Sequence, residues 1–194
     1  FDQAIVINPK TPNDQSSLND LCATGLIFLV LVYIQYENIF KDSDVLQYLD
    51  LVSLATICDL VPLTPVNRSL VKQGLKIINS DNSNKGIQTL INQAKIKQVI
   101  SEYHLGYILG PRINAGGRIG NSQLGVNLLK ETNENKTIEY AVRLDDLNNK
   151  RRLLTSELEK KVIGKIEKIL IDSSIAFAFA DSETCLVKST FFAI

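Results

Sequence analysis

The stretch YLDLVSLATICDLVPL, residues 48–63, is an apolar run that we expect to form a helix. Apolar and small side chains recur along it every three to four residues, the spacing of one helix face, which predicts a helix over residues 45–57. The residue before Pro62 is driven out of the α region, so the helix must end there. Between residues 51 and 63 the one charged side chain is Asp59, which falls at the predicted helix end.

The isolated carboxylate of Asp59 is the first candidate for chemistry. A carboxylate among apolar neighbours is costly to bury unless it is paired, hydrogen-bonded or bound to a metal. From the residues alone two interpretations stay open: a structural aspartate at a helix end or turn, or a metal ligand. Asp50 lies about two and a half helical turns away and points to a different face, so the two carboxylates are not expected to act as a pair.

A second candidate is LGPRINAGGRIGNSQLG, residues 109–125, where glycines surround two fixed cations. Glycine lets the backbone take a positive φ and approach a ligand closely, and the guanidinium groups of Arg112 and Arg118 can bind phosphate bidentately. In an extended segment Arg112 and Asn114 would project to the same side, and the N–H groups of residues 116–117 could add an anion nest. The chemistry leaves an alternative equally open: a glycine-rich turn whose arginines bind helix C-terminal carbonyls.

The rest of the pattern is mostly helical and shows no internal repeat. The longest periodic stretch, residues 137–170, predicts one helix of about 30 residues, longer than the usual globular mean, and suggests a connector between two domains. Its second half is basic, and a solvated helix face is the simplest explanation. The short β-branched run at residues 4–7 and the apolar run at residues 174–179 each predict a strand. Shorter patterns predict helices from residue 16 or 17 to about 40, and over residues 68–78, 87–94, 101–109 and 123–130.

Composition limits the partners and the compartment. The chain has 21 basic and 21 acidic residues, so any nucleic-acid site would have to be a local one. Its three cysteines are far apart and His104 is the one histidine, which excludes a zinc site made by this chain alone and fits a reducing cytoplasm. The apolar run at residues 21–34 is too short to span a bilayer and predicts a fully buried core helix. Because the chain begins at Phe1 and contains no Met, we expect a piece of a longer polypeptide.

Several of these stretches, taken in order, resemble the RecJ family, the single-stranded-DNA-specific exonucleases of the DHH phosphoesterase superfamily. Residues 48–63 followed by NRSLVKQGL resemble the family's fourth motif, and LGPRINAGGRIGNSQLGVNLL resembles its downstream Arg-Asn motif. LDDLNNKRRLLTSELE resembles the interdomain helix, whereas AIVINPKTPN and LCATGLIF resemble the strand and helix that follow the DHH motif. The resemblance covers about residues 1–175 and keeps the order of the family.

The resemblance implies an α/β fold in which helices cover the parallel sheet of a DHH domain. This chain would hold a mostly helical piece of it, with one N-terminal strand, a long connector helix and a C-terminal strand. Residues 1–132 would be the C-terminal part of the catalytic domain, residues 133–171 the connector, and residues 172–194 the truncated start of a second, DHHA1-like domain. The last residues, 181–194, do not resemble the family's next motif.

The resemblance also implies an activity: hydrolysis of phosphodiester bonds in single-stranded DNA from the 5′ end, in DNA repair and recombination in the cytoplasm. Mn²⁺ or Mg²⁺, held by Asp and His side chains, would be the cofactor. Asp59 matches the family's catalytic, metal-binding aspartate, and Arg112, Asn114 and Arg118 match positions that contact the nucleic acid. The implied partners are single-stranded DNA and the N-terminal part of the same enzyme, with no membrane.

The departures from the family pattern are large. The family's first three motifs, which carry further aspartates and the DHH triplet, are absent from this sequence, so we expect the 194-residue chain to be inactive alone. Two alternatives stay open: a phosphatase or oligonucleotide-degrading enzyme of the same superfamily, and an inactive helical remnant of a split or decayed gene. The long connector helix and the Arg-Asn stretch favour a RecJ-type nuclease over the smaller relatives.

Overall fold

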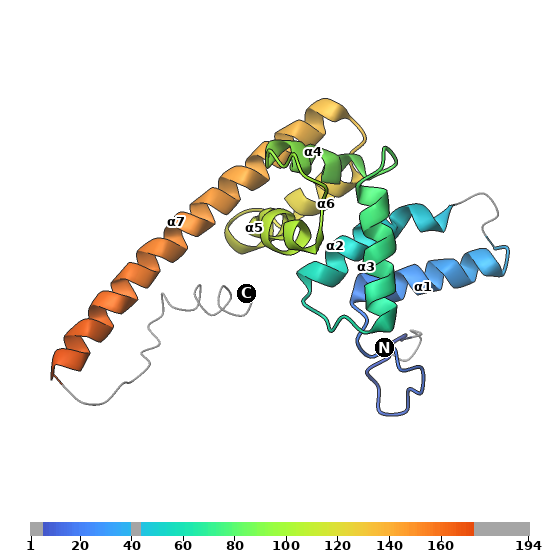
Figure 1. Cartoon of the computed structure of the whole chain (residues 1–194), viewed down its shortest axis with the longest axis horizontal. Helices are drawn as coiled ribbons and strands as arrows, with labels where there is room; N and C mark the ends of the chain where they lie inside the picture. The colour runs from blue at the N-terminus through green and yellow to red at the C-terminus, as the bar shows by residue number, and fades with distance from the viewer. Residues whose placement is uncertain (1–5, 40–43, 173–194) are drawn as a thin grey trace.

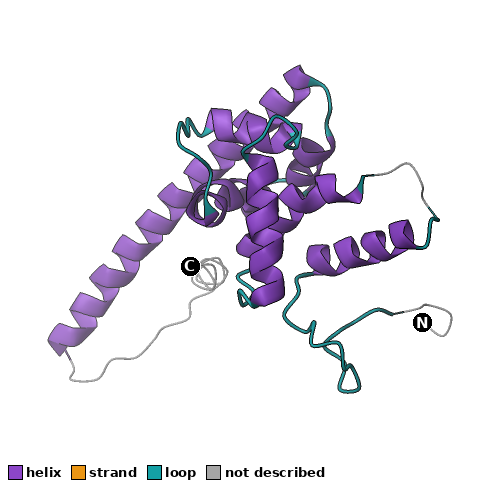
Figure 2. Cartoon of the chain, turned by 45° about the vertical axis from the view of Figure 1, so that its right-hand side comes forward, coloured by secondary structure: helices purple, strands orange, loops and turns teal. Residues whose placement is uncertain are grey.

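The computed structural model describes residues 6–39 and 44–172, with side chains up to residue 165, and all regular structure in these ranges is helical (Figure 1, Figure 2). Within the same ranges no helix combines the length and the apolar character needed to cross a lipid bilayer. The elements in chain order are α1 (Ala23–Tyr36), the 3₁₀ helix η1 (Val45–Tyr48), α2 (Leu49–Cys58), α3 (Pro65–Ile78), α4 (Lys85–Gln93), the π-helix η2 (His104–Leu109), α5 (Gly110–Ile119), α6 (Gln123–Lys130) and α7 (Glu134–Asp172).

The helices α2 to α6 and the first half of α7 form one packed body, and the second half of α7 extends away from it (Figure 1). Within the body α2 packs along α3, and α4, α5 and α6 all contact α7. The main core lies between these helices and includes Ile87, Leu105, Leu128 and Leu144, each fully buried. A smaller apolar cluster joins α1 to η1, α2 and α3.

A close crossing of α2 and α3 at Gly74 fixes the position of α2. A Cβ atom at Gly74 would collide with the backbone oxygen of Leu49 and lie 2.5 Å from the Cβ of Ser53. The two helices can approach this closely because glycine has no side chain. The buried face of α2 follows the predicted periodicity at Val52, Ser53 and Thr56, so the helix presents its C-terminal end at a defined place in the fold.

A buried carboxylate ties the start of α2 to the start of α4. Asp50, which is 2% exposed, accepts hydrogen bonds from the backbone N–H groups of Asn84 (2.7 Å) and Leu51 (2.6 Å). The Asn84 side chain caps α4 by accepting from the N–H of Ile87 and donates to the carbonyl of Leu129 at the end of α6. Burial raises the pKa of Asp50, although its three backbone hydrogen bonds act in the opposite direction.

The expectations for the first part of the chain are wrong in two respects. The helix predicted from residue 16 or 17 begins at Ala23, because residues 8–20 form turns and bends and the thiol of Cys22 caps the helix by accepting from the N–H of Gly25. The expected full burial of α1 is also wrong, since the helix packs on η1 and α2 on one side only and leaves Ile27 (60%) and Tyr33 (61%) exposed.

The two expected strands are not seen in the described residues. Residues 6 and 7, the described half of the expected strand at 4–7, are exposed and lack regular structure. The expected strand at 174–179 lies outside the described residues. The later helices agree with the sequence pattern: α3, α4, α6 and α7 each begin and end within a few residues of the predicted bounds.

Candidate nucleic-acid interface

The glycine-rich stretch 109–125 is helical, so the expectation of an extended anion loop is wrong. The stretch forms the end of η2, then α5 and the start of α6, and no glycine in the described residues has a positive φ. The break expected at Gly110-Pro111 is bridged because η2 is a π-helix, in which the N–H of Gly110 donates to the carbonyl of Leu105. Pro111 then lies in the first turn of α5, directly after the π-helix.

Glycine serves helix packing in this stretch, and Gly110 shows it most clearly. A Cβ atom at Gly110 would lie 2.5 Å from the sulfur of Cys58 and 2.9 Å from the carbonyl oxygen of Leu105. The start of α5 therefore rests directly against the end of α2. This contact brings the second candidate segment next to the first one.

A groove of about 760 Å³ opens where the end of α2, η2, α5 and the middle of α7 meet. Cys58 and Leu60, the neighbours of Asp59, are part of its lining. Two of the candidate residues of α5, Asn114 and Arg118, line the same groove. Two residues that the sequence reasoning did not single out, Arg151 and Arg152, come from α7 together with apolar side chains at Leu158, Val162 and Ile163.

Three arginines concentrate positive charge in this groove, although the chain as a whole is neutral. Arg151 is half-buried, and its pKa is lowered by burial and further by the charges of Arg118 and Arg152. The guanidinium of Arg151 also donates to the side-chain oxygen of Asn148 at 3.2 Å, which orients it. Among the described residues that line the groove, Glu159 is the one with an acidic side chain. Such a local excess of cations favours binding of an anion.

Arg112, by contrast, lies in an ion pair away from the groove lining. Its Nε donates to Oδ1 of Asp145 in α7 at 2.8 Å, and its Nη1 donates to the carbonyl of Ile108 at 2.8 Å. The two charged side chains are mostly buried, with 16% and 19% of their surfaces exposed. The structure therefore brings Asn114 and Arg118 together in one groove and uses Arg112 to join α5 to α7. The predicted contact of Arg112 with nucleic acid stays a prediction.

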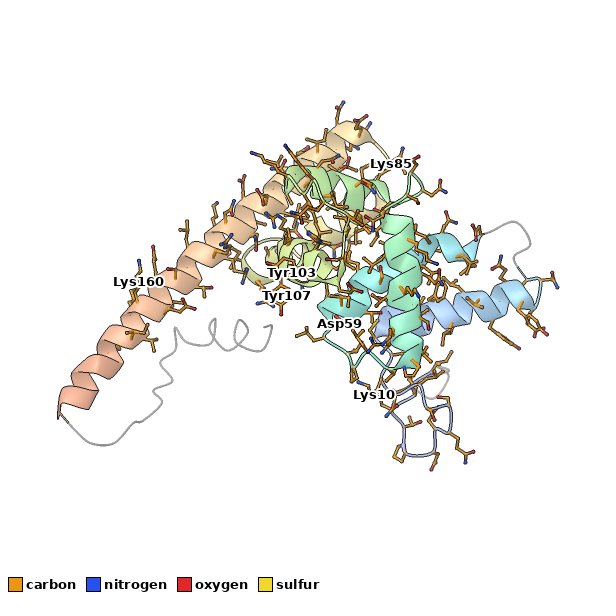
Figure 3. All side chains as sticks on the ribbon, in the orientation of Figure 1. Lys10, Asp59, Lys85, Tyr103, Tyr107 and Lys160 are labelled. Atoms are coloured by element: carbon orange, nitrogen blue, oxygen red, sulfur yellow. The ribbon has the colours of Figure 1, made fainter. Side chains whose placement is uncertain are left out.

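Asp59 follows the last residue of α2 and is exposed, as expected for an aspartate at a helix end. Its N–H still donates to the carbonyl of Ala55, and Leu60 after it takes a positive φ of 53°, so the chain turns sharply beyond the carboxylate. Figure 3 shows Asp59 on the edge of the body near Tyr103 and Tyr107. Burial and the charge of Asp59 raise the pKa of the neighbouring Cys58 thiol to about 12.

The described residues do not assemble a metal site by themselves. Among them no group of three or more His, Cys, Asp or Glu side chains lies close enough to hold an ion. His104 is buried and its Nδ1 lies 3.0 Å from the backbone nitrogen of Ser101, as expected for a packed helix residue. The carboxylate of Asp50 is buried in the core, where it accepts a hydrogen bond from the N–H of Asn84. Because a hard divalent cation takes about six or more oxygen ligands, Asp59 would be one ligand of a larger set.

Comparison with known proteins matches most of this chain to one kind of enzyme. No family model matches. The single-stranded-DNA-specific exonuclease RecJ of Haemophilus influenzae is 32% identical over 167 residues, which make up 81% of this chain and 29% of that protein. Over most of its length, this chain is similar to part of RecJ. The RecJ of Salmonella typhimurium is 29% identical over 178 residues, 87% of this chain and 31% of that protein. The chain thus spans less than a third of the length of these RecJ proteins.

Solved RecJ structures share the fold. A crystal structure of exonuclease RecJ bound to manganese has a TM-score of 0.66 and 28% identity, and covers 73% of this chain and 35% of that one. RecJ from Thermus thermophilus in complex with Mn²⁺ has a TM-score of 0.68 and 27% identity, over 79% of this chain and 22% of that one. The chain therefore has the fold of part of RecJ, as the sequence motifs indicated. The strands expected from the α/β class are absent from residues 6–39 and 44–172.

Proposed function

We propose that the chain is the part of a RecJ-like exonuclease that binds the phosphates of single-stranded DNA. The observation that carries the proposal is the cluster of Arg118, Arg151 and Arg152 in one groove, whose lining includes Cys58 and Leu60 on either side of Asp59. Guanidinium groups bind phosphate oxygens through paired, charge-assisted hydrogen bonds. Asn114 adds a side-chain amide that can donate a hydrogen bond to the phosphate oxygens of the same DNA strand. The RecJ relatives carry the name of single-stranded-DNA-specific exonucleases, which fits a groove of this charge.

We assign Asp59 as one ligand of a Mn²⁺ or Mg²⁺ ion, because the RecJ structures similar to this one are complexes with these ions. The described residues supply too few further ligands for a complete site. The remaining ligands would have to come from residues that the structure does not describe or from another polypeptide. The chain's own contribution would then be to position the phosphate backbone along the arginines and to place one carboxylate beside the groove.

Binding can be tested by fluorescence anisotropy with a labelled single-stranded oligodeoxynucleotide. Replacing Arg118 and Arg151 together by Ala should weaken binding and reduce the dependence of affinity on salt. The logarithmic slope should fall by about 0.7 for each phosphate that the variant no longer neutralises. Arg143→Ala is the matched control, because Arg143 lies on the exposed face of α7 and pairs with Glu139 outside the groove. Equal effects of the two sets of substitutions would contradict the proposal.

Catalysis is a separate test. We expect the purified 194-residue chain to release no nucleotides from single-stranded DNA in Mn²⁺, because its described residues do not form a metal site. The measurement is digestion of a 5′-labelled oligonucleotide followed on a gel. Digestion by the wild-type chain that disappears in Asp59→Asn would refute the expectation of inactivity and would support the role of Asp59.

A further inference from the structure

Tyr103 and Tyr107 form an aromatic pair at the groove that the proposed phosphate contacts do not explain. Their ring centroids lie 5.1 Å apart and the ring planes differ by 25°, so the rings are stacked. Both side chains are exposed, at 61% and 63% of their surfaces. Tyr107 lines the same groove as Arg118 and Arg151. The pair therefore presents aromatic surface to solvent beside the cluster of cations.

Local structure holds this pair in place. Tyr103 lies immediately before η2 and Tyr107 inside it. The ring of Tyr103 makes an edge-on contact with His104, with centroids 5.8 Å apart and planes at 81°. His104 is buried and its Nδ1 lies 2.9 Å from the hydroxyl of Ser101. The first ring is thus supported by a fixed buried side chain, and the second ring stacks on the first.

We propose that Tyr103 and Tyr107 are a stacking platform for the bases of a single-stranded nucleic acid whose phosphates lie along Arg118, Arg151 and Arg152. Proteins that hold single strands without reading their sequence combine a basic groove with exposed aromatic side chains, because every base has a face that can stack. Here Tyr107 lines the groove together with the arginines, and Tyr103 stacks on Tyr107. The inference rests on the proposed function of the groove and assigns the residues that hold the bases.

The test compares two labelled oligonucleotides of equal length, one with bases and one abasic, so that both offer the same phosphates. Replacing Tyr103 and Tyr107 together by Leu should weaken binding of the oligonucleotide with bases roughly 10-fold or more and leave binding of the abasic one within about twofold. The double Phe variant should bind both as the wild type does. The matched control replaces Tyr33 and Tyr36 by Leu, since these exposed tyrosines lie on α1, away from the groove.

A spectroscopic measurement gives a second readout. An oligonucleotide with 2-aminopurine at successive positions should lose fluorescence on binding to the wild-type chain, because stacking quenches this base. The Leu variant should leave the fluorescence unquenched at saturating protein. Circular dichroism of each variant shows whether the helices are retained, as expected for substitutions at exposed positions.

The outcomes separate the two proposals. One outcome is that the arginine substitutions weaken binding of both oligonucleotides, whereas the Leu variant binds both like the wild type. The stacking platform is then refuted and the proposed phosphate-binding groove stands. If the Leu substitutions weaken binding of both oligonucleotides equally, the tyrosines act on the fold or on a different ligand, and the platform is refuted as well. If the wild-type chain binds neither oligonucleotide, both the proposed function and the platform fail.

Discussion

At the scale of single residues, the carboxyl group of Asp50 links protonation to folding. The group is 2% exposed and its pKa is raised by burial. A raised pKa means that the folded state binds this proton more tightly than the unfolded state does. The stability that the protonated group contributes is present below the unfolded pKa, which is about 4 for Asp, and is lost as the pH rises through the higher folded pKa.

The variant Asp50→Asn cannot ionise and serves as the reference for this effect. We expect the free energy of unfolding of the wild type, measured relative to this variant, to fall as the pH rises from about 4 through the folded pKa. Urea denaturation at a series of pH values measures the difference. If the unfolding free energy of the wild type instead rose relative to that of Asp50→Asn as the pH rises, the hydrogen bonds from Asn84 and Leu51 would outweigh burial and hold the carboxylate ionised.

At the scale of elements, the crossing of α2 and α3 is the contact most sensitive to added volume. Gly74→Ala would place a methyl group against the backbone oxygen of Leu49, an atom that can move only with its helix. We expect a loss of about 1–3 kcal/mol in the free energy of unfolding, the usual cost of overpacking. Denaturant melts followed by circular dichroism measure it.

The control for that substitution is in α7. A Cβ at Gly164 would meet nothing within 4 Å, so Gly164→Ala should raise helix stability by about 0.5–1 kcal/mol through the lower entropy of alanine. If Gly74→Ala were as harmless as Gly164→Ala, the close approach of α2 and α3 in the structure would be incorrect.

At the scale of the whole molecule, the ion pair of Arg112 with Asp145 joins α5 to α7, two of the helices that line the groove. A double-mutant cycle with Arg112→Ala and Asp145→Ala should give a coupling of about 1–2 kcal/mol in unfolding free energy, since both groups are mostly buried. The exposed pair of Arg143 and Glu139 in the same helix should give about 0.3–0.5 kcal/mol. Equal couplings would exclude a special role for the buried pair.

Sequence periodicity predicted the helices well and their assembly poorly. The spacing of apolar residues indicated α2, α3, α6 and α7, and the helix-end position of Asp59 followed from Pro62. The groove could not be predicted this way, because Arg118 and Arg151 are 33 positions apart in the printed sequence and meet only when α5 packs on α7. A basic pair within the helix at 151–152 was the one signal, and a solvated helix face was the simplest explanation of it.

The packing of Gly110 against Cys58 links two positions that are far apart in the sequence. Any side chain at 110 needs the space that the sulfur of Cys58 occupies, so a change at one position restricts what the other can tolerate. Alanine at 110 would be accepted most readily beside alanine at 58. Among diverging relatives, substitutions at these two positions should therefore occur together, as expected for residues in direct contact.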